Sequence, residues 1–407
     1  MSEIFETISA CRVCNSQNIE EVLDLGNQPP ANSLHKNNLD MPPLVPLRLL
    51  FCNDCSAVQL GETVDPEYLF NEYVWVTGTS STAEIYSKEF TKNALTVSGL
   101  SKPSVLEIAS NDGTFLKCFQ DEGCEILGVD PAKNIADKAI KNGIPTKSEF
   151  FTSDLALSLV ESNGNYDIVF ARNVIPHVKA IHSIIEGINI LMSEESTGII
   201  EFHEAGLILK ELHYDSIYHE HLFYFSLKTI SHLLEMYDLF VFDIMPSPIS
   251  GGSWVIYFSK VKKTKTKKLN EVEASEEKLG INNINTWKKF SRKVEEHSDQ
   301  LKRMLPVGQK ILAYGASARS STLLNYCGID SRNLIAIVDK NPLKHNLLSP
   351  GTEIPIISYQ EGLDILKTED NLFLLAWNFE KEIIRDLKQD GYKGEFIVPL
   401  PNDPRKV

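Results

Sequence analysis

The sequence predicts an α/β protein in which a small cysteine-paired module precedes two α/β domains. Two C-x-x-C pairs lie within the first 60 residues. From about 103 to 258, short apolar runs alternate with helical stretches, which is typical of βαβ units around a parallel sheet. The same alternation starts again near 308. The length of 407 residues agrees with this reading, because it corresponds to two or three domains.

The composition excludes several classes of protein. Hydrophobic residues make up 43% of the chain and charged residues 23%, which excludes a disordered chain. The 40 Lys+Arg against 55 Asp+Glu give a formal charge of −15, so we expect no nucleic-acid partner and no membrane partner. No apolar run approaches the ~20 residues that cross a bilayer, and the N-terminus lacks the features of a signal peptide. We therefore expect a cytoplasmic protein, with a monomer as the expected state and an oligomer left open.

The paired cysteines predict a structural zinc site. Cys11 and Cys14 form one knuckle, Cys52 and Cys55 form the other, and 37 residues separate them. Two such turns complete a tetrahedral four-thiolate site, which leaves no open position for catalysis. The intervening chain must loop out, and its segment GNQPPANS at 26–33 suits a loop. The alternatives are four ordinary buried cysteines or a redox pair.

The first strand of the central domain predicts a cofactor site. VLEIA at 105–109 runs into Ser110-Asn111-Asp112-Gly113, and a second strand ends at Asp130, 23 residues after Glu107. Nucleoside-binding α/β folds hold ribose hydroxyls with an acid in that place. The loop lacks G-x-G-x-x-G, which disfavours a dinucleotide. It is similar instead to motif I of class I (Rossmann-like) S-adenosylmethionine (SAM) methyltransferases. Asp112 and Asp130 as solvated loop acids are the alternative.

A further strand, YDIVFA, ends beside Arg172 and Asn173, and ligands of open α/β sheets bind at the carboxyl ends of the strands. The loops after 108, 130, 151 and 172 are therefore expected to converge. The candidate cofactor residues are Glu107, Ala109, Asn111, Asp112, Asp130, Pro131, Phe151, Arg172 and Asn173.

The run Ile217-Tyr218-His219-Glu220-His221 places a phenol, two imidazoles and a carboxylate together. On a strand, His219 and His221 would share a face; on a helix, Tyr218 and His221 would. Imidazole transfers protons near neutral pH, and a carboxylate can fix its tautomer. An interdomain hydrogen-bond cluster and a His-x-His metal site are the alternatives, and His177 alone is as readily structural as functional.

Three later segments complete the pattern. Ser250-Gly251-Gly252-Ser253 allows close backbone approach to a ligand or simply turns the chain. Residues 260–268 hold six lysines, which indicate a solvated linker or, less readily, a phosphate-binding patch. An apolar stripe then predicts a helix, with Ile284, Trp287, Val294, His297, Leu301 and Leu305 on one face.

Together these motifs resemble one family, the SAM-dependent sugar C-methyltransferases that act on nucleotide-linked 4-keto-deoxysugars, including TDP-sugar C-3'-methyltransferases. The matching segments are CRVC…FCNDC, YVWVTGTSST, VLEIASNDGTFL…GVDPA, ARNVIPHV, IYHEHLFYFS, YGASARSSTLLNY…VDKNP…PGTEIPI and AWNFEKEI. The resemblance implies a zinc-binding module and hinge at 1–80, a SAM-binding methyltransferase domain at 81–258, a linker and helix at 259–305, and a Rossmann-like nucleotide-sugar-binding domain at 306–407.

The resemblance also implies roles for single residues. His221 matches the general base, and Tyr218, Glu220 and His177 match its active-site neighbours. The residues that match the binding of the nucleotide-sugar are Tyr73, Arg319, Asn325, Asp339, Trp377 and Asn378. The implied reaction removes a proton beside the ketone, and the enolate carbon then attacks the methyl group of SAM.

This chain departs from the family pattern in four places. Ala109 replaces the usual glycine of motif I. The segment that usually reads H-G-G-S-x-R runs from Ser250 to Val255 here, without the histidine and the arginine. Trp75 replaces the second tyrosine of a Y-x-Y pair, and the loop at 315–322 reads GASARSST. An anionic substrate is then expected to meet Arg319, with Arg172 or Lys340 as further cations.

Two other functions stay open on the same residues. A related enzyme would keep the scaffold but carry out O- or N-methylation or epimerisation. A non-catalytic zinc-bearing adaptor would not bind SAM, and the clustered titratable groups disfavour it.

Overall fold

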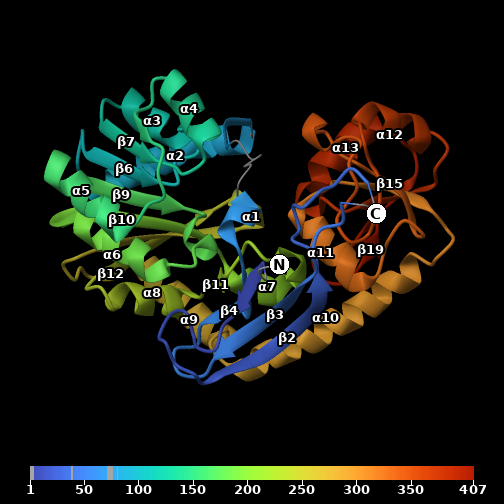
Figure 1. Ribbon diagram of the computed structural model, residues 1–407, viewed down its shortest axis with the longest axis horizontal. Helices are drawn as coiled ribbons and strands as arrows, with labels where there is room; N and C mark the ends of the chain where they lie inside the picture. Colours follow the sequence, from blue (N-terminus) through green and yellow to red (C-terminus); the bar gives the residue numbers. More distant parts are fainter. Residues whose placement is uncertain (1–3, 38–39, 71–76, 80) are drawn as a thin grey trace.

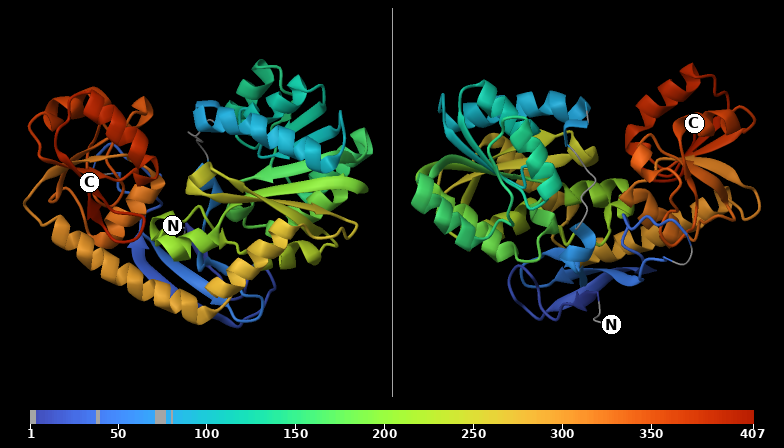
Figure 2. Two further views of the ribbon diagram at one scale, coloured as in Figure 1. Left: turned by 180° about the vertical axis from the view of Figure 1, so that it is seen from behind. Right: turned by 45° about the horizontal axis from the view of Figure 1, so that its top comes forward.

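The computed structural model describes residues 4–37, 40–70, 77–79 and 81–407. Two α/β lobes lie side by side, and the N-terminal sheet and the long helix α10 (Ile284–Met304) run beneath both of them (Figures 1 and 2). The predicted fold class is confirmed: each lobe holds a largely parallel sheet, and the four cysteines gather in the N-terminal module. Within the described residues, no helix is long and apolar enough to cross a membrane.

The N-terminal module is built on a four-stranded antiparallel sheet of order β11-β4-β3-β2. Its strands are β2 (Ile19–Gln28), β3 (Val45–Cys52), β4 (Val58–Leu60) and β11 (Phe223–Tyr224). A second pair joins β1 (Phe5–Thr7) to β5 (Glu62–Val64), and the short helix α1 (Pro66–Phe70) follows. The fourth strand of the sheet, β11, comes from the middle of the chain, where Phe223 pairs with Gln59 and Tyr224 with Val58. The module and the central lobe therefore share one sheet.

The central lobe is a seven-stranded sheet of order β12-β13-β10-β9-β6-β7-β8. Its parallel strands are β6 (Ser104–Ile108), β7 (Glu125–Val129), β8 (Thr146–Lys147), β9 (Tyr166–Arg172) and β10 (Met192–His203). The antiparallel edge is formed by β12 (Phe240–Ser247) and β13 (Ser253–Ser259). The strands are buried on both faces, as the apolar runs in the sequence predict.

Helices surround this sheet. They are α2 (Ser81–Ser98), α3 (Thr114–Asp121), α4 (Lys133–Lys141), α5 (Ser153–Asn163), α6 (Ile181–Leu191), α7 (Ala205–Glu211) and α8 (Leu227–Glu235). Helix α3 begins directly after the loop that follows β6, so this loop lies at the carboxyl edge of the sheet, between neighbouring strands β9, β6 and β7. That edge is where a ligand of an open α/β sheet binds.

The connection to the second lobe is formed by α9 (Lys267–Leu279) and α10. The predicted stripe is confirmed, because Trp287, Val294, His297 and Leu301 are buried on one face of α10. The lysines before α9 pair within the protein: Lys262 and Lys263 lie over the rings of Phe240 and Phe242, and further lysines pair with glutamates of α9. These contacts favour a structural linker over a phosphate-binding patch.

The C-terminal lobe is a six-stranded sheet of order β16-β15-β14-β17-β18-β19. Its strands are β14 (Ile311–Tyr314), β15 (Leu334–Val338), β16 (Ile356–Ile357), β17 (Asn371–Leu374), β18 (Glu395–Val398) and β19 (Arg405–Lys406), and its helices are α11 (Ala318–Cys327), α12 (Tyr359–Leu366) and α13 (Glu380–Gln389). Helix α11 packs against α10 and against the 3-10 turn Tyr214–Ser216 of the central lobe. The two lobes thus meet beside the Tyr218–His221 run.

Candidate active site

The four cysteines of the N-terminal module form one cluster. Their Sγ atoms all lie within 4.8 Å of one another, and the Cys11–Cys55 and Cys14–Cys52 pairs are 3.6 and 3.5 Å apart. Thiolates on a tetrahedral zinc ion sit about 3.8 Å apart, since each Zn–S bond is about 2.3 Å. Nε2 of Gln59 donates a hydrogen bond to Sγ of Cys11 at 3.0 Å, a second contact that orients the ligand. The donor set and its spacing fit a closed structural zinc site.

The loop after β6 has an unusual backbone. Ala109, Asn111 and Gly113 all have positive φ angles, of 56°, 50° and 78°. A glycine adopts this conformation without steric cost, whereas a β-carbon in it costs roughly 1 kcal/mol. The position explains why glycine is usual where this chain has Ala109. The turn brings main-chain N–H groups to the carboxyl edge of the sheet.

Asp130 holds this loop in place. One carboxylate oxygen accepts a hydrogen bond from the N–H of Asn111 at 2.8 Å, and the other accepts from the N–H of Ala132 at 2.9 Å. Burial raises the pKa of Asp130. Pro131 follows it at the exposed surface. The acid at the end of the second strand therefore lies at the predicted place, joined to the motif I loop.

Glu107 lies at the end of β6 and is 2% exposed. Its Oε2 atom is buried without a hydrogen-bond partner among the described residues, and burial raises the pKa of this carboxyl well above its usual range. A buried acceptor without a donor costs free energy until a ligand supplies one. The acceptor of Glu107 and the turn beside Asp130 thus fit the hydroxyls and amine of an adenosyl cofactor.

A segment that precedes α2 closes over the same loop. The N–H of Thr77 donates to Oδ1 of Asn111 at 2.9 Å, and the N–H of Gly78 donates to Oδ2 of Asp112 at 3.2 Å. A β-carbon on Gly78 would lie only 2.7 Å from that oxygen, so glycine permits the approach. The predicted aromatic residue Tyr73 and its neighbour Trp75 lie outside the described residues.

The remaining predicted cofactor residues differ in their placement. Asn173 follows β9 with φ 49° and its N–H donates to the carbonyl of Glu201 at 2.9 Å. The guanidinium of Arg172 pairs with the buried carboxylate of Glu201 at 2.7 Å and lies 3.2 Å from the ring centre of Phe115. This charge is neutralised inside the lobe, so the expectation that Arg172 meets an anionic substrate is not supported.

Phe151 is also directed into the lobe. Its ring packs against α6, where a β-carbon on Gly187 would lie 2.8 Å from Cε1 of Phe151. The residue is 7% exposed and belongs to the main apolar core. Its contacts indicate packing against α6 within the core.

Tyr218 and His221 form a hydrogen-bonded pair in a turn, neither on a strand nor on a helix. Nδ1–H of His221 donates to the carbonyl of Ser216 at 3.0 Å, which leaves the Nε2 lone pair to accept from the hydroxyl of Tyr218 at 2.8 Å. The N–H of His221 also bonds to the carbonyl of Tyr218 at 2.9 Å and closes the turn. The turn thus fixes the tautomer and aims the lone pair of His221.

His177 lies against this pair. It ends the 3-10 turn Ile175–His177 after β9, and its ring centre is 4.7 Å from that of His221, with the planes at 73°. Burial lowers the pKa of His177 to about 4. Burial, and then the nearby His177, lowers the pKa of His221 well below its usual range. Both imidazoles are therefore neutral at neutral pH, as a general base requires.

The other two members of the run face the N-terminal module. Nε2–H of His219 donates to the carbonyl oxygens of Val45 and Pro46 at 3.2 and 3.3 Å. Oε1 of Glu220 accepts a hydrogen bond from Nδ2 of Asn32 at 2.6 Å, and burial raises the pKa of Glu220 to about 7. His219 is thus structural, and among the described residues the cysteines alone form a metal-type cluster.

Asn32 was not predicted as a site residue. It lies in the segment GNQPPANS, which the sequence marks only as a loop. Local patterning holds no signal for its role, because its partner Glu220 is 188 positions away.

Arg319 and Trp377 join the C-terminal lobe to the central lobe. The guanidinium of Arg319 donates to both carboxylate oxygens of Asp215 at 3.1 and 2.9 Å and lies 4.6 Å from the ring centre of Trp377. Nε1–H of Trp377 donates to the same carboxylate at 2.8 Å. The charge of Arg319, which is expected from the sequence to meet an anionic substrate, is therefore paired with Asp215 within the protein.

The glycine turn after β12 lies beside the guanidinium of Arg319. A β-carbon on Gly251 would lie 3.7 Å from Nη1 of Arg319, and one on Gly252 would lie 2.3 Å from Cδ1 of Leu207. The two glycines have φ angles of 83° and 133°. Glycine is thus required at 252 by the approach of Leu207, whereas at 251 it is favoured by the positive φ angle.

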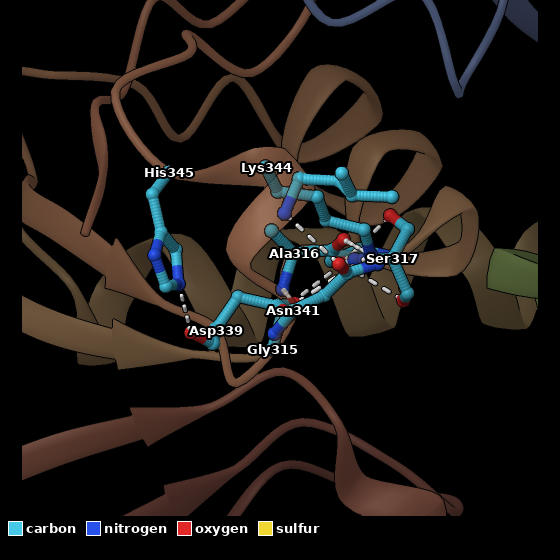
Figure 3. A network of polar contacts seen from close by, with 9 residues as sticks. Gly315, Ala316, Ser317, Asp339, Asn341, Lys344 and His345 are labelled. Carbon is cyan, nitrogen blue, oxygen red and sulfur yellow. Dashed lines mark hydrogen bonds and ion pairs between the residues drawn. The ribbon is translucent and has the colours of Figure 1, made fainter. Parts of the chain in front are cut away.

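Asp339 follows β15 as Asp130 follows β7. Its carboxylate accepts from the N–H of Ala316 at 2.9 Å and from the N–H of Asn341 at 2.8 Å (Figure 3). Nζ of Lys344 donates to the carbonyl of Ala316 at 2.6 Å, and Nε2 of His345 lies 2.8 Å from the carbonyl oxygen of Asp339. The C-terminal lobe therefore repeats the hydrogen bonds that Asp130 makes with the motif I loop.

Three further predicted residues lie around this lobe. Nδ2 of Asn325 donates to the carbonyl of Pro350 at 3.0 Å, so its amide fastens a turn. Asn378 is exposed next to the buried Trp377. Lys340 pairs with Asp386 at 3.3 Å on the surface. The structure thus brings Tyr218, His221, Glu220 and His177 together, while the predicted substrate residues spread along the C-terminal lobe.

Comparisons with known sequences cover the chain in three consecutive parts. A zinc binding domain matches residues 11–70, a methyltransferase domain matches 83–243, and a C-methyltransferase C-terminal domain matches 248–401. The C-methyltransferase NovU of Streptomyces niveus is 29% identical over 419 residues, which span 100% of this chain and 99% of that protein.

Two solved structures that resemble this chain each cover less than half of it. Magnesium protoporphyrin IX methyltransferase (ChlM) of Synechocystis PCC 6803 with bound SAM is 12% identical, with a TM-score of 0.34 over 44% of this chain and 79% of that chain. The PH0226 protein of Pyrococcus horikoshii OT3 is 13% identical, with a TM-score of 0.36 over 47% of this chain and 98% of that chain.

Proposed function

We propose that this chain, which belongs to the SAM-dependent C-methyltransferases with a zinc-binding module, methylates a carbon beside the ketone of a nucleotide-linked 4-keto-deoxysugar, with TDP as the expected nucleotide. The observation that carries the proposal is the Tyr218–His221 pair, in which a neutral imidazole presents an aimed lone pair. Such a base suits removal of a proton from carbon, a step that methyl transfer to an oxygen or nitrogen does not require.

Methylation of a carbon beside a ketone releases one proton, which the protein must accept. A hydrogen on a carbon beside a ketone is weakly acidic, so a positioned base breaks the C–H bond and leaves an enolate that is nucleophilic at that carbon. SAM supplies a methyl group bonded to a sulfonium sulfur, which accepts the electrons of the broken bond when the new C–C bond forms. The protein must therefore hold the proton and stabilise the enolate oxygen.

His221 is proposed to receive the proton at Nε2. Its Nδ1–H already donates to the carbonyl of Ser216, so protonation at Nε2 gives an imidazolium that is stabilised on its other side. The hydroxyl of Tyr218 stands 2.8 Å from that nitrogen and either relays the proton or donates to the enolate oxygen. Tyr218→Phe is expected to slow both exchange of the substrate hydrogen and methyl transfer in either role, because both need the enolate.

The two arginines are poorly exposed to a nucleotide-sugar, since their side chains are 9% and 16% exposed. Arg172 is paired with Glu201, and Arg319 is paired with Asp215. Lys340 and Lys344 follow β15 at the carboxyl edge of the C-terminal sheet. They also pair with carboxylates, of Asp386 and Asp339, but their side chains are more exposed than those of the two arginines. We propose that this edge takes the nucleotide, with Asp339 in the place that Asp130 has for the cofactor.

The proposal is tested with SAM and a panel of TDP-4-keto-6-deoxysugars that carry deuterium at the carbon beside the ketone. Methyl transfer with loss of one deuterium is expected, measured by mass spectrometry. Exchange of deuterium without consumption of SAM would indicate an epimerase. No transfer and no exchange across the panel would overturn the proposed function.

A further inference from the structure

The active-site loop carries a contact from the N-terminal module. Nδ2 of Asn32 donates a hydrogen bond to Oε1 of Glu220 at 2.6 Å. Glu220 is 9% exposed, and its neighbour in sequence, His221, accepts from Tyr218. A buried carboxyl group depends on its donors, because burial removes the water that would otherwise bond to it.

The turn that carries Asn32 is itself held in place. The N–H of Leu34 donates to the carbonyl of Asn32 at 2.8 Å, and the N–H of Ser33 donates to the carbonyl of Pro30 at 3.0 Å. The hydroxyl of Tyr68 donates to Oγ of Ser33 at 3.2 Å. The Asn32 side chain is therefore presented by a turn with its own hydrogen bonds.

The segment 29–37, which carries Asn32 and is called the arm here, also reaches the C-terminal lobe. The N–H of Leu348 donates to the carbonyl of His35 at 2.7 Å, and Nε2 of His35 lies 3.2 Å from Oε1 of Glu353. Pro29 lies against Gly351, where a β-carbon would be 2.9 Å from Cγ of the proline. The arm from 29 to 37 thus spans from the C-terminal lobe to the active-site loop.

The loop on the other side of this contact holds the catalytic candidates. Nε2–H of His219 fastens it to β3, and β11 continues it into the sheet of the module. Glu220 lies between His219 and His221, so the direction of its carboxyl group and the position of the His221 ring are set by the same short backbone segment. A donor that fixes the Glu220 carboxyl also restricts that segment.

We propose that Asn32 is a positioning residue for methyl transfer: it fixes the Glu220 carboxyl and, with it, the loop that holds Tyr218 and His221. The zinc module then contributes a side chain to the active site and is more than a structural support. This inference rests on the proposed function of that loop.

The first test compares Asn32→Ala and Asn32→Asp with Asn27→Ala as a matched control. Asn27 is an exposed asparagine at the end of β2 in the same module. Asn32→Asp keeps the shape of the side chain and removes its N–H donor. Both Asn32 variants are expected to lower kcat about 10-fold or more, with SAM affinity and zinc content within about 2-fold of wild type. The control is expected to keep wild-type kcat.

A double variant distinguishes positioning from a general loss of stability. If Asn32 acts through Glu220, then Asn32→Ala added to Glu220→Gln lowers kcat by no more than about 2-fold beyond Glu220→Gln alone. Multiplicative losses, or wild-type kcat in both single Asn32 variants, would overturn the proposal.

A second measurement needs no substrate. The Glu220 carboxyl is titrated by carbon NMR with labelled glutamate, and Glu220→Gln identifies its signal. The titratable groups of its own loop are Tyr218, His219 and His221, His177 of the neighbouring turn contacts this loop, and Asn32 is the neutral donor from the module. The pKa of Glu220 is expected to rise in Asn32→Ala, because a donor to the ionised form is lost. An unchanged pKa overturns the role of Asn32, whereas a wild-type enzyme that methylates no keto-sugar overturns only the proposed function.

Discussion

Asp130 and Asp339 hold equivalent positions in the two α/β lobes. Each follows the second strand of its sheet, and each accepts a hydrogen bond from a main-chain N–H of the loop after the first strand, at 2.8 Å from Asn111 and 2.9 Å from Ala316. Each carboxylate also accepts from the N–H two residues further on, at 2.9 and 2.8 Å. The shape of each ligand loop therefore depends on one acid.

The two acids are expected to affect different ligands. Asp130→Asn should weaken SAM binding about 10-fold or more, because hydrogen bonds to a charged acceptor are lost. Asp339→Asn should leave SAM binding within about 2-fold and raise KM for the nucleotide-sugar. Calorimetry with SAM and steady-state kinetics give the two values. Loss of SAM affinity in Asp339→Asn would contradict the division of roles.

His221→Ala is expected to abolish turnover while SAM affinity stays within a few-fold. The side chain is proposed as the base, and a positioned general base contributes about 10²- to 10⁴-fold to a rate. Calorimetry and a methyl-transfer assay measure the two effects. His232→Ala, on the exposed face of α8, is the matched control and should keep full activity. If His221→Ala also loses SAM affinity, the residue holds the cofactor or the fold instead.

Cys52→Ser is expected to reduce bound zinc and soluble yield. A hydroxyl is a poor substitute for a thiolate ligand, and metal binding contributes to folding of such modules. Atomic absorption on the purified protein measures the zinc content. Cys124→Ser removes a buried cysteine of the central lobe and should leave zinc unchanged. Full zinc occupancy in Cys52→Ser would refute the four-thiolate site.

Acid is expected to weaken the fold through its buried histidines. Burial lowers the pKa of His177 to about 4 in the folded protein, against a usual value of 6.5. At this histidine the unfolded chain binds more protons between these values, so the contribution of His177 to the free energy of unfolding decreases as pH falls from 6.5 towards 4. Urea unfolding at pH 7 and pH 5 measures the change.

His177→Asn provides the comparison for this prediction. The amide does not titrate, so the decrease in the free energy of unfolding between pH 7 and pH 5 should be smaller than in wild type. His203 and His213, whose pKa values burial lowers to about 3, act in the same direction. Glu220 and Glu276, whose pKa values burial raises to about 7, act in the opposite direction, and all four are common to both proteins. An unchanged slope in the variant would show that His177 is not protonated on unfolding in this range.

Local patterns in the sequence predicted the strands and the metal ligands. VLEIA and YDIVFA are β6 and β9, and two C-x-x-C turns meet in one cluster. These features depend on residues that are close in sequence. A short apolar run favours a strand buried on both faces, and a C-x-x-C turn brings two thiols together. The carboxyl-edge rule then placed Asp130 beside the motif I loop.

Long-range pairings could not be predicted in the same way. Arg319 is expected from the sequence to meet an anionic substrate, and the sequence does not predict its pairing with Asp215, 104 positions earlier. Asn32 and Glu220 are 188 positions apart. Such pairs form because the lobes pack against each other, and the periodicity and spacing of residues in one sequence do not indicate which distant residues will meet.

The sharing of β11 between the module and the central lobe has a consequence for synthesis. Val58 and Gln59 of β4 pair with Tyr224 and Phe223, which are synthesised some 164 residues later. The edge of the first sheet therefore stays unpaired until the ribosome has made those residues. An unpaired strand edge invites pairing with another chain. Expression of the first 70 residues alone is therefore expected to yield aggregates, and the shortest piece that folds by itself should extend past residue 224.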